Sequence, residues 1–387
     1  MSTVNLLDNV YKAIDEKNIS KAGCLTGRTY TKADIFARSR ERDIPLKGFE
    51  SHYGNLVDYI LRCTYDIWEE KNVGVIYTHY SEANEIYTPL GYADNVQSVV
   101  DATNGMLSGF PDRQMYSVNI VWDGNEEDGY LSSHINRSIM TNTGDSPFGK
   151  ATGKSVDVLC IADCLCKDNL IIREWLVRDS GAMVKQLGLN IEDVALKMAT
   201  ADVNADLTHW YEADTLRRTK NRKKRPVVKA LPDNAGPMDI VATMLHNVWS
   251  VHNFAMIDDY YSFNVSVEGL SGNRLCGTPN LKRLLTELHS TLSDSDFEID
   301  HIQMMDSDAG ENEKFVHCRW TLCGKHATSK MFGQGTGVPL HIMGISQYRI
   351  VNGRIAEEWT VFDEVAIWKQ IKMAQLRTIA VDSQGNV

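Results

Sequence analysis

The sequence predicts an α+β protein of two tandem domains, each with helices packed on one concave face of a curved antiparallel sheet. Residues 171–187 return at 355–371 with eight of 17 positions identical. Other matching segments follow in the same order at offsets of 181 to 184 residues, as expected for two copies of one domain. In each copy, helical periodicity comes first and a long run of strand-like segments follows. A chain of 387 residues has room for two such domains of about 140 residues each.

The first copy begins with apolar residues at helical spacing from Asn55 onward, and a second helix is predicted over 95–108. Four strand-like runs follow, at 114–122, 130–143, 154–166 and 169–177. A short helix at 180–188 closes this copy and ends at Gly188.

The second copy repeats this order of elements. The sequence predicts helices over 238–254 and 280–292, the second with Asn280 as its N-cap. Strand-like runs lie at 262–270, 296–306, 314–326, 339–350 and 353–361. Asn352-Gly353 supplies the positive φ angles of a tight hairpin turn between the last two.

These elements predict the domain boundaries. They are an N-terminal extension at 1–50, a first domain at 51–190, a charged helix and basic linker at 191–235, a second domain at 236–375 and a tail at 376–387. Within the linker, residues 217–229 hold eight basic side chains and no acid. Because the whole chain carries a net charge of −11, a solvated linker that rests on an acidic face of a domain is favoured over nucleic-acid binding.

Composition is that of an ordinary globular protein, with 43% hydrophobic and 24% charged residues. No apolar run approaches the roughly 20 residues that span a bilayer, and the N-terminus lacks the pattern of a signal peptide, so we expect a cytoplasmic protein without a membrane partner. Three of the eight cysteines, Cys160, Cys164 and Cys166, share one face of a predicted strand. No second metal-ligand cluster accompanies them, and packing is therefore favoured over a metal site.

The stretch 336–371 carries a series of motifs: Thr336-Gly337, Gly344-Ile345, Tyr348-Arg349-Ile350, Asn352-Gly353, Arg354-Ile355, Glu358, Trp359 and Asp363. With these motifs it resembles the SnoaL-like polyketide cyclases of the nuclear transport factor 2-like superfamily. The first copy is looser but keeps Thr152-Gly153, Glu174, Trp175 and Asp179. The resemblance implies a cone-shaped fold around a deep apolar pocket, a small hydrophobic ligand and no cofactor or metal. It also implies pairing of domains, either as a homodimer or as a pseudo-dimer within the tandem chain.

In the cyclases that this segment resembles, a carboxylate just after the conserved Trp is the general acid/base of an intramolecular aldol ring closure. Asp363 matches that position, and Asp179 is its counterpart in the first copy. A helix is predicted to start directly after both aspartates. Because Asp is a preferred N-cap, capping alone would also explain the repetition, and both interpretations stay open.

Further polar side chains could assist such chemistry. His341 and His317 are the candidate partners of Asp363 in proton transfer, and Arg319 shares a strand face with His317. His134, Asn136 and Ser138 share a face in the first copy. The candidate substrate-binding residues are Trp359, Tyr261, Asp258, Arg319, Asp179, Trp175 and Tyr80.

The sequence lacks a Walker A loop, a GxGxxG dinucleotide motif, an HExxH zinc motif and a GxSxG nucleophile elbow. We therefore expect a cofactor-free acid/base enzyme that acts on a small hydrophobic carbonyl compound by aldol-type cyclisation, isomerisation or dehydration. The alternative is a noncatalytic small-molecule-binding or assembly protein of the same fold.

Overall fold

The computed structural model describes residues 46–220, 225–307 and 309–384. Among these residues, the first of two compact units comprises those up to Thr88 together with Tyr92–Arg178 and Met304–Glu311. The second comprises Pro89–Gly91, Asp179–Gln303 and the chain from Asn312 onward. Most of the predicted N-terminal extension, four residues of the basic linker and the last three residues of the predicted tail lie outside the described residues.

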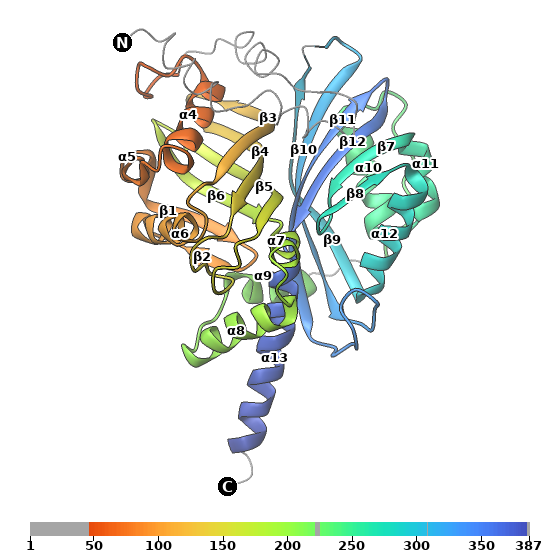
Figure 1. Ribbon diagram of the computed structural model, residues 1–387. Helices are drawn as coiled ribbons and strands as arrows, with labels where there is room; N and C mark the ends of the chain where they lie inside the picture. Colours follow the sequence, from red (N-terminus) through yellow and green to blue (C-terminus); the bar gives the residue numbers. More distant parts are fainter. Residues whose placement is uncertain (1–45, 221–224, 308, 385–387) are drawn as a thin grey trace. The chain divides into compact units, whose positions relative to one another are not determined.

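The first domain is a six-stranded sheet with helices on one face (Figure 1). Its helical elements are α4 (Leu56–Trp68), η1 (Val73–Val75), α5 (Ile76–His79) and α6 (Val96–Gly109). Its strands are β1 (Tyr80–Thr88), β2 (Gly91–Ala93), β3 (Gln114–Asn125), β4 (Gly129–Thr141), β5 (Ser155–Lys167) and β6 (Leu170–Arg178), in the order β2-β1-β6-β5-β4-β3.

The second domain repeats this architecture. Its helical elements are α10 (Pro237–Leu245), η2 (His246–Ser250), η3 (Phe254–Met256), α11 (Ile257–Tyr260) and α12 (Thr278–Ser290). Its strands are β7 (Tyr261–Gly269), β8 (Asn273–Cys276), β9 (Leu292–Asp306), β10 (Glu313–His326), β11 (Pro339–Val351) and β12 (Arg354–Phe362). The strand order β8-β7-β12-β11-β10-β9 is that of the first domain, which confirms the predicted tandem α+β fold.

Each sheet differs from the prediction in one respect, because it is mixed and not wholly antiparallel. β1 pairs with β6 in parallel, and β7 pairs with β12 in the same way. Parallel neighbours need a long crossover, and here the second helix and the intervening meander provide it. The last strand of each repeat thereby returns beside the first.

Three more helices belong to the second unit: α8 (Ile191–Asn204), α9 (Trp210–Lys220) and α13 (Glu364–Gln384). Helix α7 (Ser180–Gln186), which follows the last strand of the first sheet, is also part of this unit. An ion pair of 2.7 Å between Lys372 and Glu192 joins α13 to α8. α13 continues well past the predicted domain end at 375, and no described helix is long and apolar enough to cross a membrane.

The prediction that Asn280 caps its helix is wrong. The N-cap of α12 is Gly277, whose φ of 86° is readily accessible to glycine. Pro279 lies in the first turn, where its missing N–H costs no hydrogen bond. Asn280 instead donates from its side chain to the carbonyl of Cys276.

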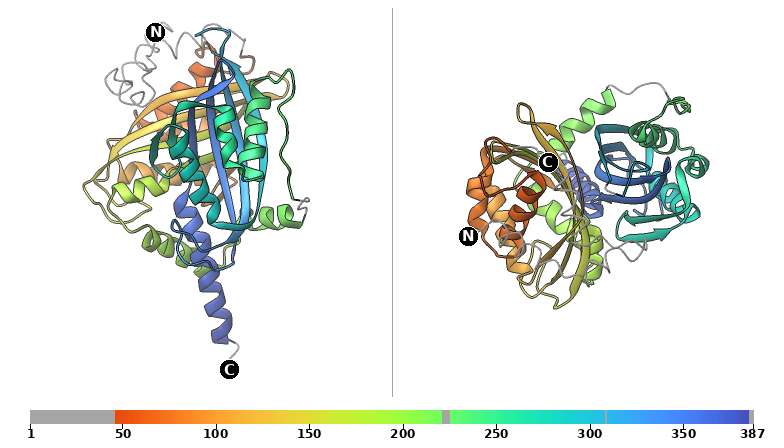
Figure 2. Two further views of the ribbon diagram at one scale, coloured as in Figure 1. Left: turned by 90° about the vertical axis from the view of Figure 1, so that its right-hand side faces the viewer. Right: turned by 90° about the horizontal axis from the view of Figure 1, so that it is seen from above.

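Each sheet has two distinct faces, shown in Figures 1 and 2. We call the face covered by the first helices of the same domain the inner face. In the second domain Trp249 of η2 packs on Trp320 of β10, with ring centroids 4.8 Å apart, and this contact marks the inner face. In the first domain the Arg113 guanidinium lies over the ring of Trp68 at the end of α4 and reaches Ser138 of β4.

Candidate functional site

A tyrosine and a glutamate form a hydrogen bond at the same place on the inner face of both sheets. Tyr80 Oη donates to Glu174 Oε2 at 3.1 Å, and Tyr261 Oη donates to Glu358 Oε2 at 2.7 Å. In each domain the tyrosine begins a strand that lies parallel to the strand of the glutamate. Both glutamates are buried.

Burial raises the pKa of both glutamates above the usual carboxyl range, since the charged form is desolvated. In the first domain the charge of Arg178 and the hydrogen bond from Tyr80 oppose this rise in the pKa of Glu174. In the second domain hydrogen bonds from Thr360 and Tyr261 oppose the rise in the pKa of Glu358. A carboxyl group with a raised pKa can exchange protons closer to neutral pH.

The inner face of the second domain is filled by aromatic side chains around this pair. The ring of Trp320 lies so close to Gly344 that a Cβ built there would overlap it. The Trp320 indole packs against Trp249 and Phe297, and its Nε1 donates to Ser346 Oγ at 2.9 Å.

The polar atoms in this interior form a continuous hydrogen-bond network. Ser346 Oγ lies 2.8 Å from Thr360 Oγ1, which donates to Glu358 Oε1 at 2.6 Å. Because Tyr261 binds the other oxygen, both oxygens of Glu358 already have partners within the fold.

The first domain has polar residues at the corresponding places. Residues paired across neighbouring strands share a face of the sheet. Asn136, Cys160 and Arg178 are aligned across β4, β5 and β6, as Trp320, Gly344 and Phe362 are across β10, β11 and β12. By the same alignment, Ser138 replaces Leu322 and His134 replaces Cys318.

Several buried polar atoms on this inner face have no hydrogen-bond partner among the described residues: Nε and Nη1 of Arg113, Oδ1 of Asn136 and Nε of Arg178. Arg113 Nη2 donates to Ser138 Oγ at 3.0 Å, and His134 Nε2 lies 2.9 Å from Ser117 Oγ. Unpartnered buried polar atoms are rare in folded proteins and usually mark a place for a water, an ion or a ligand.

The predicted catalytic residue Asp363 and its counterpart Asp179 lie at helix N-termini of the second unit. Asp363 Oδ1 accepts from the backbone amides of Val365 and Ala366, and Ser180 Oγ donates to Oδ2 at 2.6 Å. Asp179 Oδ1 accepts from the amide of Ala182 and Oδ2 from that of Gly272, at 3.0 and 2.7 Å. Both aspartates are buried N-caps, as the capping interpretation expects.

Burial raises the pKa of Asp179 to about 7. The amides of Ala182 and Gly272 oppose this rise, whereas the nearby carboxylates of Asp363 and Glu364 add to it. Asp179 is therefore a cap that is ionised at a cost in free energy.

The predicted residues on β10, β11 and β12 lie on the face of the second sheet opposite Glu358. Strand pairing puts His317, Arg319, His341 and Trp359 together on this side. His341 Nε2 lies 2.9 Å from Asp214 Oδ2 of α9, and burial lowers the pKa of His341 despite that carboxylate. His341 thus contacts the linker helix and not Asp363.

The same linker helix is held by a buried arginine. Arg218 Nε binds Asp214 at 2.6 Å, and its other nitrogens bind Glu298 and Asp300 of β9, both at 2.7 Å. Burial alone would raise the pKa of Asp214, but hydrogen bonds from His341, Arg218 and Arg217 lower it well below the usual range. The sequence predicts that the basic linker rests on an acidic face of a domain, and Arg218 makes such a contact with Glu298 and Asp300 of β9.

The remaining predicted site residues are separated. Asp258 is exposed on α11 and forms an ion pair of 2.5 Å with Lys282. Trp175 pairs with Asp163, on the opposite face from Glu174, and stacks on Tyr87 with centroids 6.1 Å apart. Of all the predicted candidates, Tyr80 and Tyr261 are the two that contact an inner-face glutamate.

The sequence reasoning missed Glu174 and Glu358 as functional candidates and used them as markers of the fold alone. Their signal is that both copies keep the glutamate directly before the tryptophan. Successive residues of a strand point to opposite faces, so a charged residue directly before Trp359 lies on the other face of the sheet, which here is the inner face.

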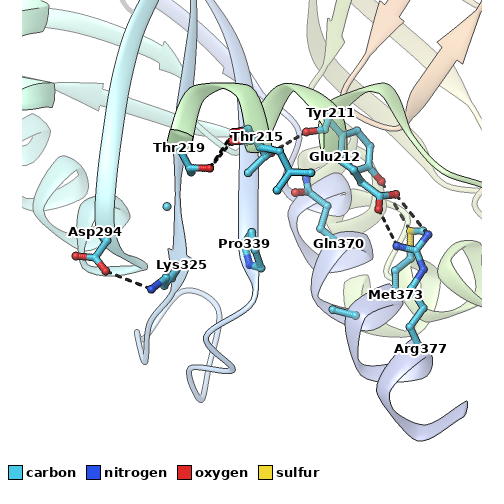
Figure 3. Close-up of a pocket in the computed structure, with 13 residues that line it drawn as sticks. Tyr211, Glu212, Thr215, Thr219, Asp294, Lys325, Pro339, Gln370, Met373 and Arg377 are labelled. Atoms are coloured by element: carbon cyan, nitrogen blue, oxygen red, sulfur yellow. Dashed lines mark hydrogen bonds and ion pairs between the residues drawn. The ribbon is translucent and has the colours of Figure 1, made fainter. Parts of the chain in front are cut away.

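The second unit also contains a pocket of about 440 Å³ between α9, α13 and the ends of β10 and β11 (Figure 3). Glu212 and Arg377 on its wall form an ion pair of 2.8 Å, and Asp294 lies 3.6 Å from Lys325. No predicted site residue lines this pocket. These charged groups are paired with one another. The residues that line the pocket include no unpartnered buried polar atom of the kind found in the first domain.

No group of three or more His, Cys, Asp or Glu side chains within the described ranges is arranged to hold a metal ion. Cys160, Cys164 and Cys166 share one face of β5, as the sequence predicts, and all three are free thiols. Burial raises the pKa of each of them, so they are poor nucleophiles at neutral pH.

Residues 239–371 match the family model of the SnoaL-like polyketide cyclases, which confirms the resemblance for the second domain. Similar solved structures include AclR of Streptomyces galilaeus, at 21% identity over 34% of this chain and 92% of that one, with a TM-score of 0.30. TsrD of Streptomyces laurentii shows 15% identity over 35% of this chain and 96% of that one, with a TM-score of 0.31. An LEH-like epoxide hydrolase of M. tuberculosis shows 14% identity over 37% and 94%, with a TM-score of 0.27. No curated protein matches the sequence.

Proposed function

We propose that this protein, whose second repeat matches the SnoaL-like polyketide cyclases, is a cofactor-free acid/base enzyme acting on a small hydrophobic carbonyl compound. The inner face of the first domain is the reacting site, and Glu174 is the group that transfers the proton. The observation that carries this proposal is a buried carboxyl with a raised pKa beside polar groups that lack partners.

The chemistry needs one base and one group that stabilises an oxyanion. Glu174 takes a proton from the carbon next to the substrate carbonyl, and the electron pair moves into the carbonyl to form an enolate. The Arg113 guanidinium lies on the same inner face with Nε and Nη1 unpartnered among the described residues, and one of these two nitrogens is suited to stabilise the oxygen that becomes negative. Return of the proton to another atom gives isomerisation. Attack of the enolate carbon on a second carbonyl gives an alkoxide, and transfer of the proton from Glu174 to this alkoxide completes aldol ring closure.

Glu174 is preferred over Asp363 as the base because of their hydrogen bonds. Both oxygens of Asp363 accept hydrogen bonds from the fold, two of which cap α13. Glu174 receives one hydrogen bond, from Tyr80, which leaves lone pairs for a proton.

Solvent deuterium exchange tests this proposal. In D₂O, acetophenone and cyclohexanone serve as carbonyl probes, and deuterium at their α-carbons is followed by NMR. The wild type is expected to accelerate exchange, and Glu174→Gln to lose at least about a hundredfold of that acceleration, the usual contribution of a general base. Glu358→Gln is the matched control, because its glutamate is enclosed by the second domain, and it should exchange at the wild-type rate. Equal rates for Glu174→Gln and wild type would refute the assignment.

The pH dependence of exchange gives a second measurement. The Tyr80 hydrogen bond lowers the pKa of Glu174, so Tyr80→Phe raises that pKa further. Because a general base must be ionised, the rising limb of the pH–rate profile should move to higher pH in Tyr80→Phe. A structural role of Tyr80 alone would reduce the amount of folded protein and leave the limb in place.

A noncatalytic role is proposed for the second domain alone. The observation that favours it is the Trp320 indole, which fills the inner face where the first domain has Asn136.

A further inference from the structure

Arg113 is a buried cation without a carboxylate partner. Its side chain is 3% exposed, and its guanidinium lies 3.9 Å from the centroid of the Trp68 ring. One nitrogen donates to Ser138 Oγ, while Nε and Nη1 have no partner among the described residues. The ring and the hydroxyl fix the orientation of the guanidinium and leave two of its nitrogens available.

Arg178 is a second cation on the same inner face. It is paired across the strands with Cys160, which is paired with Asn136. Its Nε also lacks a partner in the described part of the chain. The pKa of Arg113 falls to about 9, first because of burial and then because of repulsion by Arg178. Ser138, which binds Arg113, is two positions from Asn136 on β4, and this places both arginines on the same part of the inner face.

The neighbouring charges do not neutralise this pair. Glu69 attracts Arg113 but uses Oε1 to accept from the amide of Met115. The charge of Arg178 lowers the pKa of Glu174, but Glu174 is hydrogen-bonded by Tyr80 and forms no ion pair with either arginine. Lys71 adds another positive charge, and its Nζ donates to the backbone carbonyls of Trp68 and Arg113.

Several other buried or half-buried arginines in the described part of the chain have acidic partners. Those with ion pairs are Arg62 with Asp58, Arg137 with Asp157, Arg218 with Asp214, Glu298 and Asp300, and Arg349 with Glu313 and Glu357. Removing a charge from water is costly unless the charge is paired, so two arginines on one buried face without an ion-paired carboxylate favour binding of an external anion.

We infer that the inner face of the first domain binds the oxyanion head of a small ligand between Arg113 and Arg178. Guanidinium groups bind carboxylates and phosphates through paired N–H donors. Asn136 Oδ1 is an acceptor beside them and suits a hydroxyl or amide donor on the same ligand. The inference rests on the proposed function for its substrate class, which becomes a carbonyl compound that also carries an acidic group.

Binding is tested by calorimetric titration of the full chain with benzoate, phenyl phosphate and neutral benzamide. The wild type should bind at least one anion and should bind benzamide more weakly. Arg113→Gln and Arg178→Gln should each lose on the order of tenfold or more in affinity for that anion, as loss of a charged hydrogen bond implies. The matched control is Arg283→Gln on the surface of α12, which should bind like the wild type.

Preference for benzoate identifies a carboxylate ligand and preference for phenyl phosphate a phosphate ester, and either supports the inference when it depends on Arg113. Equal binding of benzamide, unchanged binding by both variants, or no anion binding by the wild type overturns it. Far-UV circular dichroism checks that Arg113→Gln is folded. The Arg178 side chain is partly exposed, and Arg178→Gln tests anion binding independently of Arg113→Gln.

The outcomes for binding and for catalysis are separable. Glu174→Gln should still bind the anion, because the glutamine removes the base and its negative charge and leaves both arginines in place. If deuterium exchange depends on Glu174 but anion binding is independent of both arginines, the proposed function stands and the anion site does not. The reverse result leaves an anion-binding domain without acid/base catalysis.

Discussion

Asp179 and Asp363 each hold two parts of the second unit together. One oxygen of each caps the helix that follows, and the other binds a different element: the amide of Gly272 for Asp179, and the hydroxyl of Ser180 for Asp363. These contacts account for an aspartate at the same point of both repeats without any catalytic role. A buried carboxylate at such a place holds the two elements in position, but its ionised form is costly because the charge is removed from water.

That cost predicts a pH dependence of stability. The pKa of Asp179 is about 7 in the folded protein and 3.8 in the unfolded chain, so the folded state binds more protons between these values. The free energy of unfolding should therefore fall as pH rises, by about 1.4 kcal/mol per pH unit between about pH 5 and pH 7 from this group alone. Asp179→Asn keeps a capping oxygen but cannot ionise.

Urea unfolding of wild type and Asp179→Asn at several pH values in this window measures the effect. Other titrating groups, such as the histidines, contribute equally to both proteins and cancel in the difference. The variant should gain on the wild type as pH rises. Parallel pH profiles would show that Asp179 does not titrate in this range.

At the scale of elements, α9 is anchored to the second sheet by a compact charge network. Arg218 contacts carboxylates of α9 and β9, and His341 of β11 contacts Asp214 of the same helix. The histidine that sequence reasoning placed in a catalytic pair thus helps to position the linker helix.

Two neighbouring arginines test this anchor. Arg218 is 8% exposed in its side chain and contacts three carboxylates, whereas Arg217 is 57% exposed and contacts Asp214 alone. Arg218→Met removes the cation that three carboxylates share and should lower the free energy of unfolding by about 3–5 kcal/mol. Arg217→Met is the control and should cost about 0–1 kcal/mol. Similar values for the two variants in urea unfolding would contradict the anchoring role.

Alternation and repetition were enough to predict the main helices and the longer strands along the chain in both domains. They did not predict the short strands β2 and β8 or the parallel pairing within each sheet. The candidate site was less accessible. The register of β12 shifts between Ile355 and Glu357. Alternation along the strand therefore does not predict whether Ile355 and Trp359 share a face of the sheet. The contact of His341 with Asp214 joins residues 127 positions apart, which periodicity does not report.

At the scale of the whole molecule, the two repeats share one fold but have different interiors. The second domain encloses the Trp320 indole within an aromatic cluster, and the first has unpartnered polar atoms at the corresponding positions. Duplication of a fold supplies two scaffolds, and function depends on the side chains that each one carries.

This difference predicts that shortening one buried side chain changes the free energy of unfolding of the full chain by unequal amounts in the two domains. Trp320→Ala removes a fully buried side chain and should lower the free energy of unfolding by about 3–5 kcal/mol. Asn136→Ala at the aligned position removes an oxygen without a partner and should change stability by less than about 1 kcal/mol in either direction. Chemical denaturation measures both, and a large loss for Asn136→Ala would show that the first interior is packed as tightly as the second.

The contact between Trp320 and Gly344 also limits how the two repeats can change over evolutionary time. The indole fits because Gly344 has no side chain, and the first domain has Cys160 at that place. A tryptophan introduced at Asn136 would meet the Cys160 side chain, and any side chain introduced at Gly344 would displace Trp320. Conversion of one interior into the other therefore requires two coordinated substitutions, with a strained or hollow intermediate between them. Because the repeats differ at both positions, no single mutation gives either domain the interior of the other.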